Sequence, residues 1–383
     1  ELGGLSPYTA RLVSFISGLA AITAVFGIGR ELWSDKVGAI AAVFMAVTPN
    51  FVLQSHDARP ELMVVAFWTT ALYLTLSGER LQSSLRLLLA GLVASFTADV
   101  HLNGLIIAPA LFAVLLLRRA SLRSLVVFSV GAVLGALWWA WIHLWPDPAF
   151  LREQAGAFGM GLPLDELAES PLLVIVLEIA RYILVEPRLS LVILLLAVVA
   201  AIVLLLRHRD RALLTLLLFA LVFHVFMTLF SGTKVPFYAV LLLPVAALLV
   251  ARLVDVAPAP AAWGISAAVV IVSLFSVGTI AVQQWPADYD AWIARLREHI
   301  PAGAVIQGEP TVWYGLADHA LVATPYFTWV GPYEDEIRRL GIEYVIGDDI
   351  RPVPNCSDCL EDAPQQVQAF LAEHAELVAE VQD

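Results

Sequence analysis

Long apolar segments recur through the first 284 residues of this chain, separated by short polar turns. A helix needs roughly 20 apolar residues to cross the hydrocarbon core of a bilayer. Segments near this length lie at 8–29, 37–54, 61–77, 85–100, 103–117, 123–145, 189–206, 212–230, 235–252 and 262–282. The 383 residues are 60% hydrophobic and 15% charged, whereas soluble domains are about half apolar. We predict a multi-pass α-helical membrane protein with about ten transmembrane helices.

Cationic residues favour one set of alternate turns, which sets the expected orientation in the membrane. These turns carry Arg30, Lys36, Arg80, Arg86, Arg118, Arg119, Arg123, Arg207, Arg209, Arg211 and Arg252. The opposite loops carry Arg59, Arg152, Arg181, Arg188 and Lys234 over a greater length. Because short cytoplasmic loops are enriched in Lys and Arg, we expect the first set to be cytoplasmic. The loop 146–188 and all residues after 283 are then extracytoplasmic, and the apolar run 172–185 in that loop is expected to lie on the membrane surface.

Residues 285–383 have a different pattern from the membrane domain predicted at 1–284. Short apolar runs typical of strands lie at 304–308, 320–324 and 342–347, and amphipathic helical patterns lie at 288–299, 333–340 and 364–381. This alternation predicts a small, soluble, extracytoplasmic α/β domain. The segment has eighteen Asp and Glu against five Arg. Such an acidic balance does not suit nucleic-acid binding.

Two cysteines, Cys356 and Cys359, occur in the whole chain. A structural zinc site uses four ligands, and no histidine lies close to this pair in the sequence. We therefore predict no metal site, and expect a disulfide, which is favoured on the oxidising side of a membrane.

The stretch "VLQSHDARPELMVV", residues 52–65, places several charged side chains between two apolar segments. An ionised group at the centre of a membrane helix costs roughly 2.5 to 3.5 kcal/mol, so such groups indicate function. A helix start explains Pro60 and most of Glu61, because proline suits the first turn and an anion is stabilised there. It does not explain His56, Asp57 and Arg59, which we interpret as functional.

Two other polar stretches are expected at the same membrane surface. "FTADVHLNG", residues 96–104, carries Asp99, His101 and Asn103, while "SGTKVPFYAVLLLP", residues 231–244, carries Lys234 and Tyr238. Each has a structural alternative: polar contacts between helices for Asp99 and His101, a headgroup contact for Lys234, and an interfacial aromatic belt for Tyr238.

Two cations and a nearby carboxylate make a phosphate site with a base. Arg59 together with Lys234 suits a phosphate at headgroup level, and a carboxylate beside them can act as a base. These residue types on one side of the membrane therefore predict a site for an anionic lipid.

The stretch "YTARLVSFISGLAAITAVFGIGRELWSDKVGAIAAVFMAVTPNFVLQSHDARPE" resembles the polyprenyl-phosphate-sugar-dependent glycosyltransferases with the GT-C fold. This group includes the protein O-mannosyltransferases of glycosyltransferase family 39 and the aminoarabinose transferases. "TKVPFYAVLLLPVAALLVAR" is similar to a later span of the same group. The resemblance covers about residues 8–254 and implies a GT-C-like membrane domain.

The resemblance implies inverting transfer of a sugar from a polyprenyl phosphate to a protein, lipid or cell-envelope glycan acceptor, at the outer face of the plasma membrane. The implied partners are this donor, membrane lipids and the acceptor. Asp57 and Glu61 are the implied supporting carboxylates, and Asp99, His101 and Asn103 are substrate-cavity candidates. The implied donor-phosphate ligands are Arg59, Lys234, His56 and Tyr238. The principal base of the family lies in a loop before its second span, so we expect that base upstream of Glu1.

Two alternatives to an enzyme stay open. A transporter usually has internal repeats and ionisable groups at the membrane midplane, and neither is visible in this sequence. A non-catalytic membrane protein with a GT-C-like fold is the other alternative. The sequence indicates no certain cofactor; a divalent metal is compatible with the resemblance but is not indicated by the residues.

Overall fold

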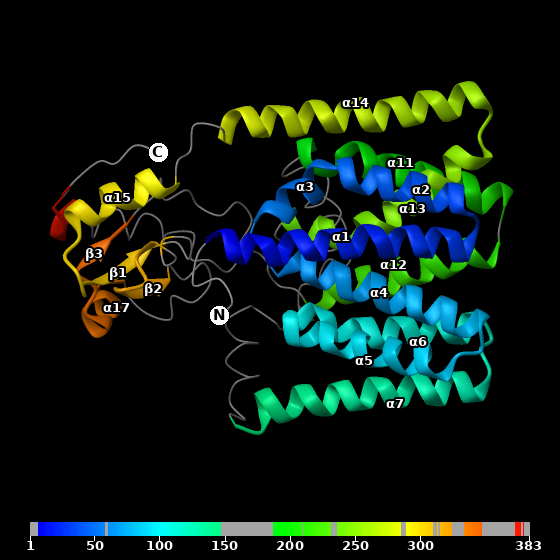
Figure 1. The fold of residues 1–383 in the computed structure, drawn as a ribbon, viewed down its shortest axis with the longest axis horizontal. Coiled ribbons are helices and arrows are strands. Elements are labelled where there is room, and N and C mark those ends of the chain that lie inside the picture. Colours follow the sequence, from blue (N-terminus) through cyan, green and yellow to red (C-terminus); the bar gives the residue numbers. More distant parts are fainter. Residues whose placement is uncertain are drawn as a thin grey trace, which may run out of the picture. The chain divides into compact units, whose positions relative to one another are not determined.

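The computed structural model describes residues 7–57, 60–146, 187–208, 210–230, 236–284, 289–308, 312, 315–323, 333–346, 372–376 and 378. The chain divides into two compact units (Figure 1). The helical unit comprises Arg11–Gly156 and Met160–Ile280, and the α/β unit comprises Glu1–Ala10, Ala157–Gly159 and Ala281–Asp383.

All ten predicted apolar segments are helical. The first six form α1 (Pro7–Leu32), α2 (Asp35–Val47), α3 (Pro49–His56), α4 (Glu61–Arg80), α5 (Ser84–Val100), the 3-10 helix η1 (Leu102–Ile106), α6 (Ile107–Leu117), α7 (Leu122–Trp139) and the π-helix η2 (Ala140–Leu144). The other four form α11 (Pro187–Arg207), α12 (Arg211–Phe230), the 3-10 helix η3 (Pro236–Leu242), α13 (Leu243–Val256) and α14 (Ala259–Gln284). The prediction of a multi-pass α-helical membrane protein is confirmed.

Not every apolar segment is one straight span. Among the described residues, seven helices are long and apolar enough to cross a membrane, and α2 with α3 makes an eighth that is bent by 64°. The other two expected spans are shorter, since α5 has 17 residues and the next apolar helix covers Gly104–Leu117. Sequence hydropathy located all ten helical segments but did not show where they bend or shorten.

Burial separates the core helices from those that face lipid. The most apolar windows of α4 and α13 are 72% and 78% buried, whereas those of α7 and α14 are only 22% and 11% buried. Figure 1 accordingly places α7 and α14 at opposite edges of the helical unit. In the core, Trp68 of α4 stacks on Phe219 of α12 with ring centroids 4.7 Å apart.

Helices α5 and α7 pack with their backbones in close approach. A Cβ atom on Gly91 would overlap the Phe128 carbonyl oxygen, and one on Gly131 would overlap that of Leu88. The Ser95 hydroxyl donates a hydrogen bond to the Ala132 carbonyl across the same contact, at 2.8 Å. Small residues allow this approach, which drives helix association where lipid surrounds the helices.

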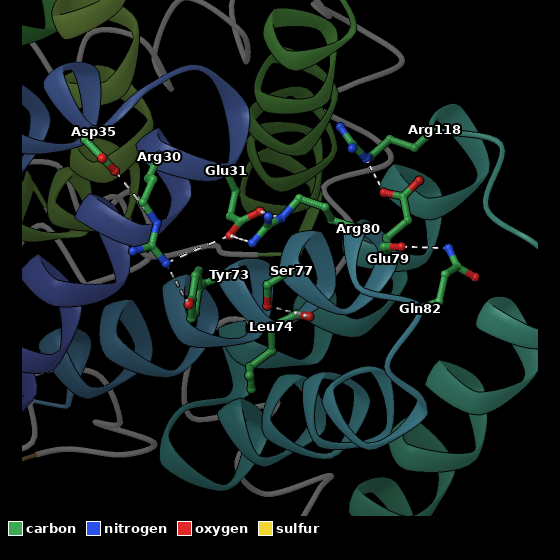
Figure 2. A network of polar contacts seen from close by, with 10 residues as sticks. All are labelled: Arg30, Glu31, Asp35, Tyr73, Leu74, Ser77, Glu79, Arg80, Gln82 and Arg118. Carbon is green, nitrogen blue, oxygen red and sulfur yellow. Dashed lines mark hydrogen bonds and ion pairs between the residues drawn. The ribbon is translucent and has the colours of Figure 1, made fainter.

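Ion pairs join the helix ends at the turns α1–α2, α4–α5 and α6–α7 (Figure 2). The carboxylate of Glu31, with only 3% of its side chain exposed, lies 2.6 Å from Arg80 Nε and 4.0 Å from Arg30 Nη2. Arg30 Nη2 also donates to the Tyr73 hydroxyl at 3.4 Å. Arg118 pairs with Glu79 in the same network. Several cations that set the expected orientation are therefore neutralised by carboxylates within the protein.

A second set of polar contacts joins α12 and α13 to the turn after α1. Lys36 Nζ lies 3.1 Å from Asp255, and Arg252 lies 2.7 Å from the same carboxylate. Trp33 Nε1 donates to Asp210 Oδ2 at 3.1 Å. The "GRELW" segment, residues 29–33, thus supplies packing and ion pairs that hold helix ends together.

The α/β unit contains a three-stranded parallel sheet with the order β2-β1-β3. Its described elements are α15 (Tyr289–His299), β1 (Val305–Gly308), β2 (Ala320–Ala323), α17 (Tyr333–Leu340) and β3 (Tyr344–Val345). Each lies within or close to its predicted range. Ile293 and Leu296 of α15 pack with Ile306 of β1 to form the core. Of the predicted helix 364–381, only residues 372–374 are described as helical, and the predicted surface helix 172–185 and both cysteines lie outside the described residues.

A charged cluster ties α15 to the segment before β2. Arg297 Nη2 lies 2.9 Å from Asp318 Oδ1. His319 Nδ1 lies 3.2 Å from the same carboxylate, and its Nε2 lies 3.0 Å from the Pro301 carbonyl oxygen. The cluster therefore links α15 and Pro301, which follows it, to the segment that precedes β2.

The close approach of α5 and α7 predicts that Gly91→Ala destabilises the helical unit. The added methyl group must displace the α7 backbone, and such overpacking costs about 1 to 3 kcal/mol. Thermal unfolding in detergent measures the change. Gly278→Ala on α14 is the matched control, because a Cβ there meets nothing within 4 Å. Equal unfolding temperatures for the two variants would contradict the packing described.

We expect acid to weaken the α/β unit through Asp318. A backbone hydrogen bond at residue 318 lowers the pKa of this carboxyl below its ordinary 3.8, and the charge of Arg297 and the hydrogen bond from His319 act in the same direction. Because the pKa is lower in the folded state, the stabilisation is complete above pH 3.8 and is lost as pH falls through the folded value.

Amide hydrogen exchange of α15 and β1, measured in the whole protein as pH is lowered, tests this expectation. Asp318→Asn should reduce the acid dependence, whereas the control Asp290→Asn on α15 should preserve it. Identical acid profiles for Asp318→Asn and the unaltered protein would show that the cluster does not couple to folding.

Candidate functional site

The bend between α2 and α3 positions the first group of predicted site residues. Pro49 occupies the first turn of α3, where its missing N–H ends the hydrogen-bonding pattern of α2. The Thr48 hydroxyl donates instead to the Phe44 carbonyl at 2.7 Å. The resulting short helix ends at His56, so His56 and Asp57 lie at the turn that leads into α4.

His56, Asp57 and Glu61 occupy this turn in different surroundings. His56 Nδ1 lies 2.8 Å from the Val52 carbonyl oxygen of its own helix. Asp57 caps the C-terminus of α3, its backbone N–H donating to Leu53 O at 3.1 Å. Glu61 lies in the first turn of α4 with only 2% of its surface exposed. The helix N-terminus stabilises that carboxylate, while Arg59 lies outside the described residues.

Helix η3 contacts both α3 and α4 and brings Tyr238 to the same region. Tyr238 is 8% exposed, and its ring meets that of His101 edge-on, with centroids 5.8 Å apart. The structure therefore brings together two residues that were predicted from stretches more than a hundred positions apart. Lys234 lies outside the described residues, and Asn103 lies in η1 with a side chain that is not described.

Asp99 has a partner that the sequence analysis missed. His143 Nε2 lies 2.7 Å from Asp99 Oδ1, which is the kind of interhelical contact considered as the alternative for Asp99. His143 belongs to the π-helix η2, and π-helical turns occur frequently at functional sites. The signal was present in the sequence, since "WWAWIHLW" places one histidine among tryptophans at the end of an apolar segment.

Buried amides on α3 were also missed. Asn50 Nδ2 donates to Ser190 Oγ of α11 at 3.2 Å, but within the described chain Asn50 Oδ1 and both polar atoms of Gln54 have no hydrogen-bond partner. Each unsatisfied buried group costs roughly 1 to 3 kcal/mol. The sequence did contain an indication of these buried amides, because Asn50 and Gln54 are four positions apart and therefore share one helix face, close to His56 and Asp57.

The described side chains suit acid–base chemistry and recognition of a polar headgroup. Two carboxylates, two imidazoles and a phenol lie on α3, α4 and η3 or at the ends of α3 and α5. Helices α3, α4 and η3 contact one another, and the ring contact between His101 and Tyr238 adds the end of α5. Among the residues that the structure describes, no three His, Cys, Asp or Glu side chains are grouped to hold a metal ion.

Comparison with known proteins agrees with this architecture. The family model of dolichyl-phosphate-mannose-protein mannosyltransferases matches residues 1–145. No curated protein matches the sequence.

Two solved glycosyltransferases illustrate the structural similarity. ArnT from Cupriavidus metallidurans bound to undecaprenyl phosphate matches with a TM-score of 0.59 and 14% identity, over 90% of this chain and 77% of that one. In the apo state the same protein gives a TM-score of 0.57 over 82% and 71% of the two chains, also at 14% identity. The archaeal oligosaccharyltransferase AglB from Archaeoglobus fulgidus, in complex with an inhibitory peptide and a dolichol-phosphate, matches with a TM-score of 0.53 and 15% identity, over 88% of this chain and 58% of that one.

These similarities confirm the fold that the sequence resemblance implied. The protein has the GT-C fold of multi-pass membrane glycosyltransferases.

Proposed function

We propose that this protein is a membrane glycosyltransferase that moves a sugar from a polyprenyl-phosphate donor to an acceptor. The observation that carries the proposal is the gathering of α3, α4 and η3, with the end of α5 joined to them by the His101–Tyr238 contact, so that carboxylate, imidazole and phenol side chains share one region of a GT-C helical unit. The family model over residues 1–145 supports the same reaction type. ArnT bound to undecaprenyl phosphate and AglB bound to a dolichol-phosphate support this class of donor.

The roles we propose follow from the chemistry of each group. Transfer needs a base near the attacking oxygen and cations that stabilise the departing lipid phosphate. Asp57 and Glu61 are the carboxylates of the α3–α4 turn. Arg59 and Lys234 are the cations, lying two positions before the start of α4 and of η3 respectively.

The reaction is proposed to take place at the extracytoplasmic face of the plasma membrane. The paired cations Arg30, Arg80 and Arg118 gather at the turns opposite to the site end of α4, and short loops rich in cations face the cytoplasm. The α/β unit then lies outside the cell, where its acidic surface suits contact with an acceptor or with solvent.

Asp57→Asn and Glu61→Gln should each slow sugar transfer about a hundredfold, at the lower end of what a general base contributes. The assay follows transfer of a radiolabelled sugar from a polyprenyl-phosphate donor by the whole protein in lipid. Asp35→Asn is the matched control, since this exposed carboxylate lies at the opposite end of α1 and α2 from the site and makes one 4.0 Å pair with Arg30. Unchanged turnover in both site variants would remove the assigned roles.

Lys234→Gln should weaken binding of polyprenyl phosphate about tenfold or more, because a hydrogen bond to a charged group contributes roughly 1.5 to 3 kcal/mol. Lys36→Gln is the matched control, as Lys36 is the other lysine of the chain and pairs with Asp255 at 3.1 Å. Binding is measured by the change in thermal unfolding with added lipid phosphate. Equal affinities for the two variants would place the donor phosphate elsewhere.

The same two measurements separate the enzyme from a GT-C-like protein without catalysis. An enzyme binds the lipid phosphate and transfers the sugar, whereas a non-catalytic relative binds the lipid with no transfer. A protein that neither binds nor transfers has another function.

A further inference from the structure

A second candidate site in the helical unit combines an apolar cavity with the Asp99–His143 pair. A cavity of about 270 Å³ lies between α5, the η1–α6 segment and α7. Its wall consists of Ser95, Ala98, Leu105, Ala108, Pro109, Ala132, Val133, Ala136 and Trp139. The one hydroxyl in this wall, that of Ser95, already donates to the Ala132 carbonyl. The cavity therefore offers an apolar surface to whatever occupies it.

This cavity is accessible from the lipid-facing side of the unit. Val133 and Leu105, which belong to its wall, are 56% and 40% exposed. The window of α7 with the highest hydropathy is only 22% buried, so that most of this helix faces hydrocarbon. A volume near 270 Å³ is just below the range of about 300–1,000 Å³ typical of small-molecule pockets. It suits part of an alkyl chain rather than a whole ligand.

The Asp99–His143 pair lies next to two residues of the cavity wall, Ala98 and Trp139. Ala98 precedes Asp99 on α5, and Trp139 lies one helical turn before His143, with ring centroids 5.7 Å apart. Asp99 Oδ1 accepts from His143 Nε2 at 2.7 Å, while 40% of the Asp99 side chain is exposed. An exposed carboxylate already bonded to an imidazole accepts a further hydrogen bond from a neutral donor but repels an anion.

Tryptophans indicate the depth of this pair in the bilayer. Trp141 and Trp145 flank His143 and are 61% and 81% exposed. Trp138 packs edge-on against Trp141 with centroids 5.6 Å apart. Tryptophan is enriched where hydrocarbon meets the headgroups. The pair is therefore at headgroup level, and the apolar cavity extends from it into the hydrocarbon region.

We infer that this cavity binds one acyl chain of an uncharged lipid, whose headgroup hydroxyl donates to Asp99. The chain fills the space between α5, α6 and α7, and the hydroxyl meets the carboxylate at the tryptophan-rich end. This binding requires neither sugar nor polyprenyl phosphate, so it can be tested independently of the proposed transfer reaction.

The test uses diacylglycerol with a diazirine at the end of one acyl chain, added to the whole protein in phosphatidylcholine nanodiscs. Phosphatidic acid with the same chains is the anionic comparison. After irradiation, mass spectrometry locates the labelled peptides. We expect labelling within residues 95–109 and 132–139, and a preference for diacylglycerol of about tenfold or more, the range of one hydrogen bond to a charged group.

Ala136→Phe fills the cavity and should lower labelling by both probes about tenfold, because each buried methylene contributes roughly a factor of four to binding. Val126→Phe is the matched control, since Val126 is on the same helix, is exposed, and does not line the cavity. Ala108→Leu fills the space from α6 and replaces Ala136→Phe if that variant fails to fold.

Asp99→Ala should make the two probes label equally without abolishing labelling. The inference is overturned if diacylglycerol labels the lipid-facing helices uniformly, if Ala136→Phe labels as strongly as Val126→Phe, or if phosphatidic acid labels at least as well as diacylglycerol. Retained preference in Asp99→Ala would remove the headgroup contact.

Discussion

The hydrocarbon core of a membrane offers no hydrogen bonds to an open backbone, and this constraint organises the helical unit. Non-α-helical backbone at membrane depth is tolerated only where protein covers it or where it lines a cavity. Among the described segments, the breaks occur at Thr48 between α2 and α3, in η1, in the π-helix η2 and in η3. The η3 backbone is covered by protein, with Ala239, Val240 and Leu241 all buried. Gly104 of η1 lies so close to the Thr97 carbonyl that no side chain fits between them.

These breaks bring the polar residues of the site together. His56 and Asp57 are held by the short helix that Pro49 begins, His101 lies between α5 and η1, and Tyr238 lies in η3. A continuous α-helix would carry such side chains along its length, whereas a break turns the chain and concentrates them at one end. Irregular backbone is thus located where the chemistry is proposed to occur.

The sequence predicted the helical segments and the positions of the strands along the chain because both depend on local periodicity. Each apolar run is long enough to be recognised alone, and the ranges 304–308 and 333–340 needed no distant partner. The partners of charged residues were not predictable in this way. Arg80 and Glu31 are 49 positions apart, and His143 and Asp99 are 44 apart. No single-sequence pattern specifies which cation meets which carboxylate once helices pack.

Two buried glutamates show that residue type alone does not predict the role of a side chain. Glu31 directly follows Arg30 in the sequence, and Glu61 lies two positions after Arg59. Both glutamate side chains are almost fully buried. Glu31 lies among Arg30 and Arg80 at a helix C-terminus, where two cations compensate a charge that the dipole does not favour. Glu61 lies at a helix N-terminus, beside the irregular η3. There the helix dipole favours a negative charge, in contrast to the position of Glu31. The first arrangement fixes helix ends, whereas the second keeps a buried carboxylate at the α3–α4 turn, where the proposed reaction takes place.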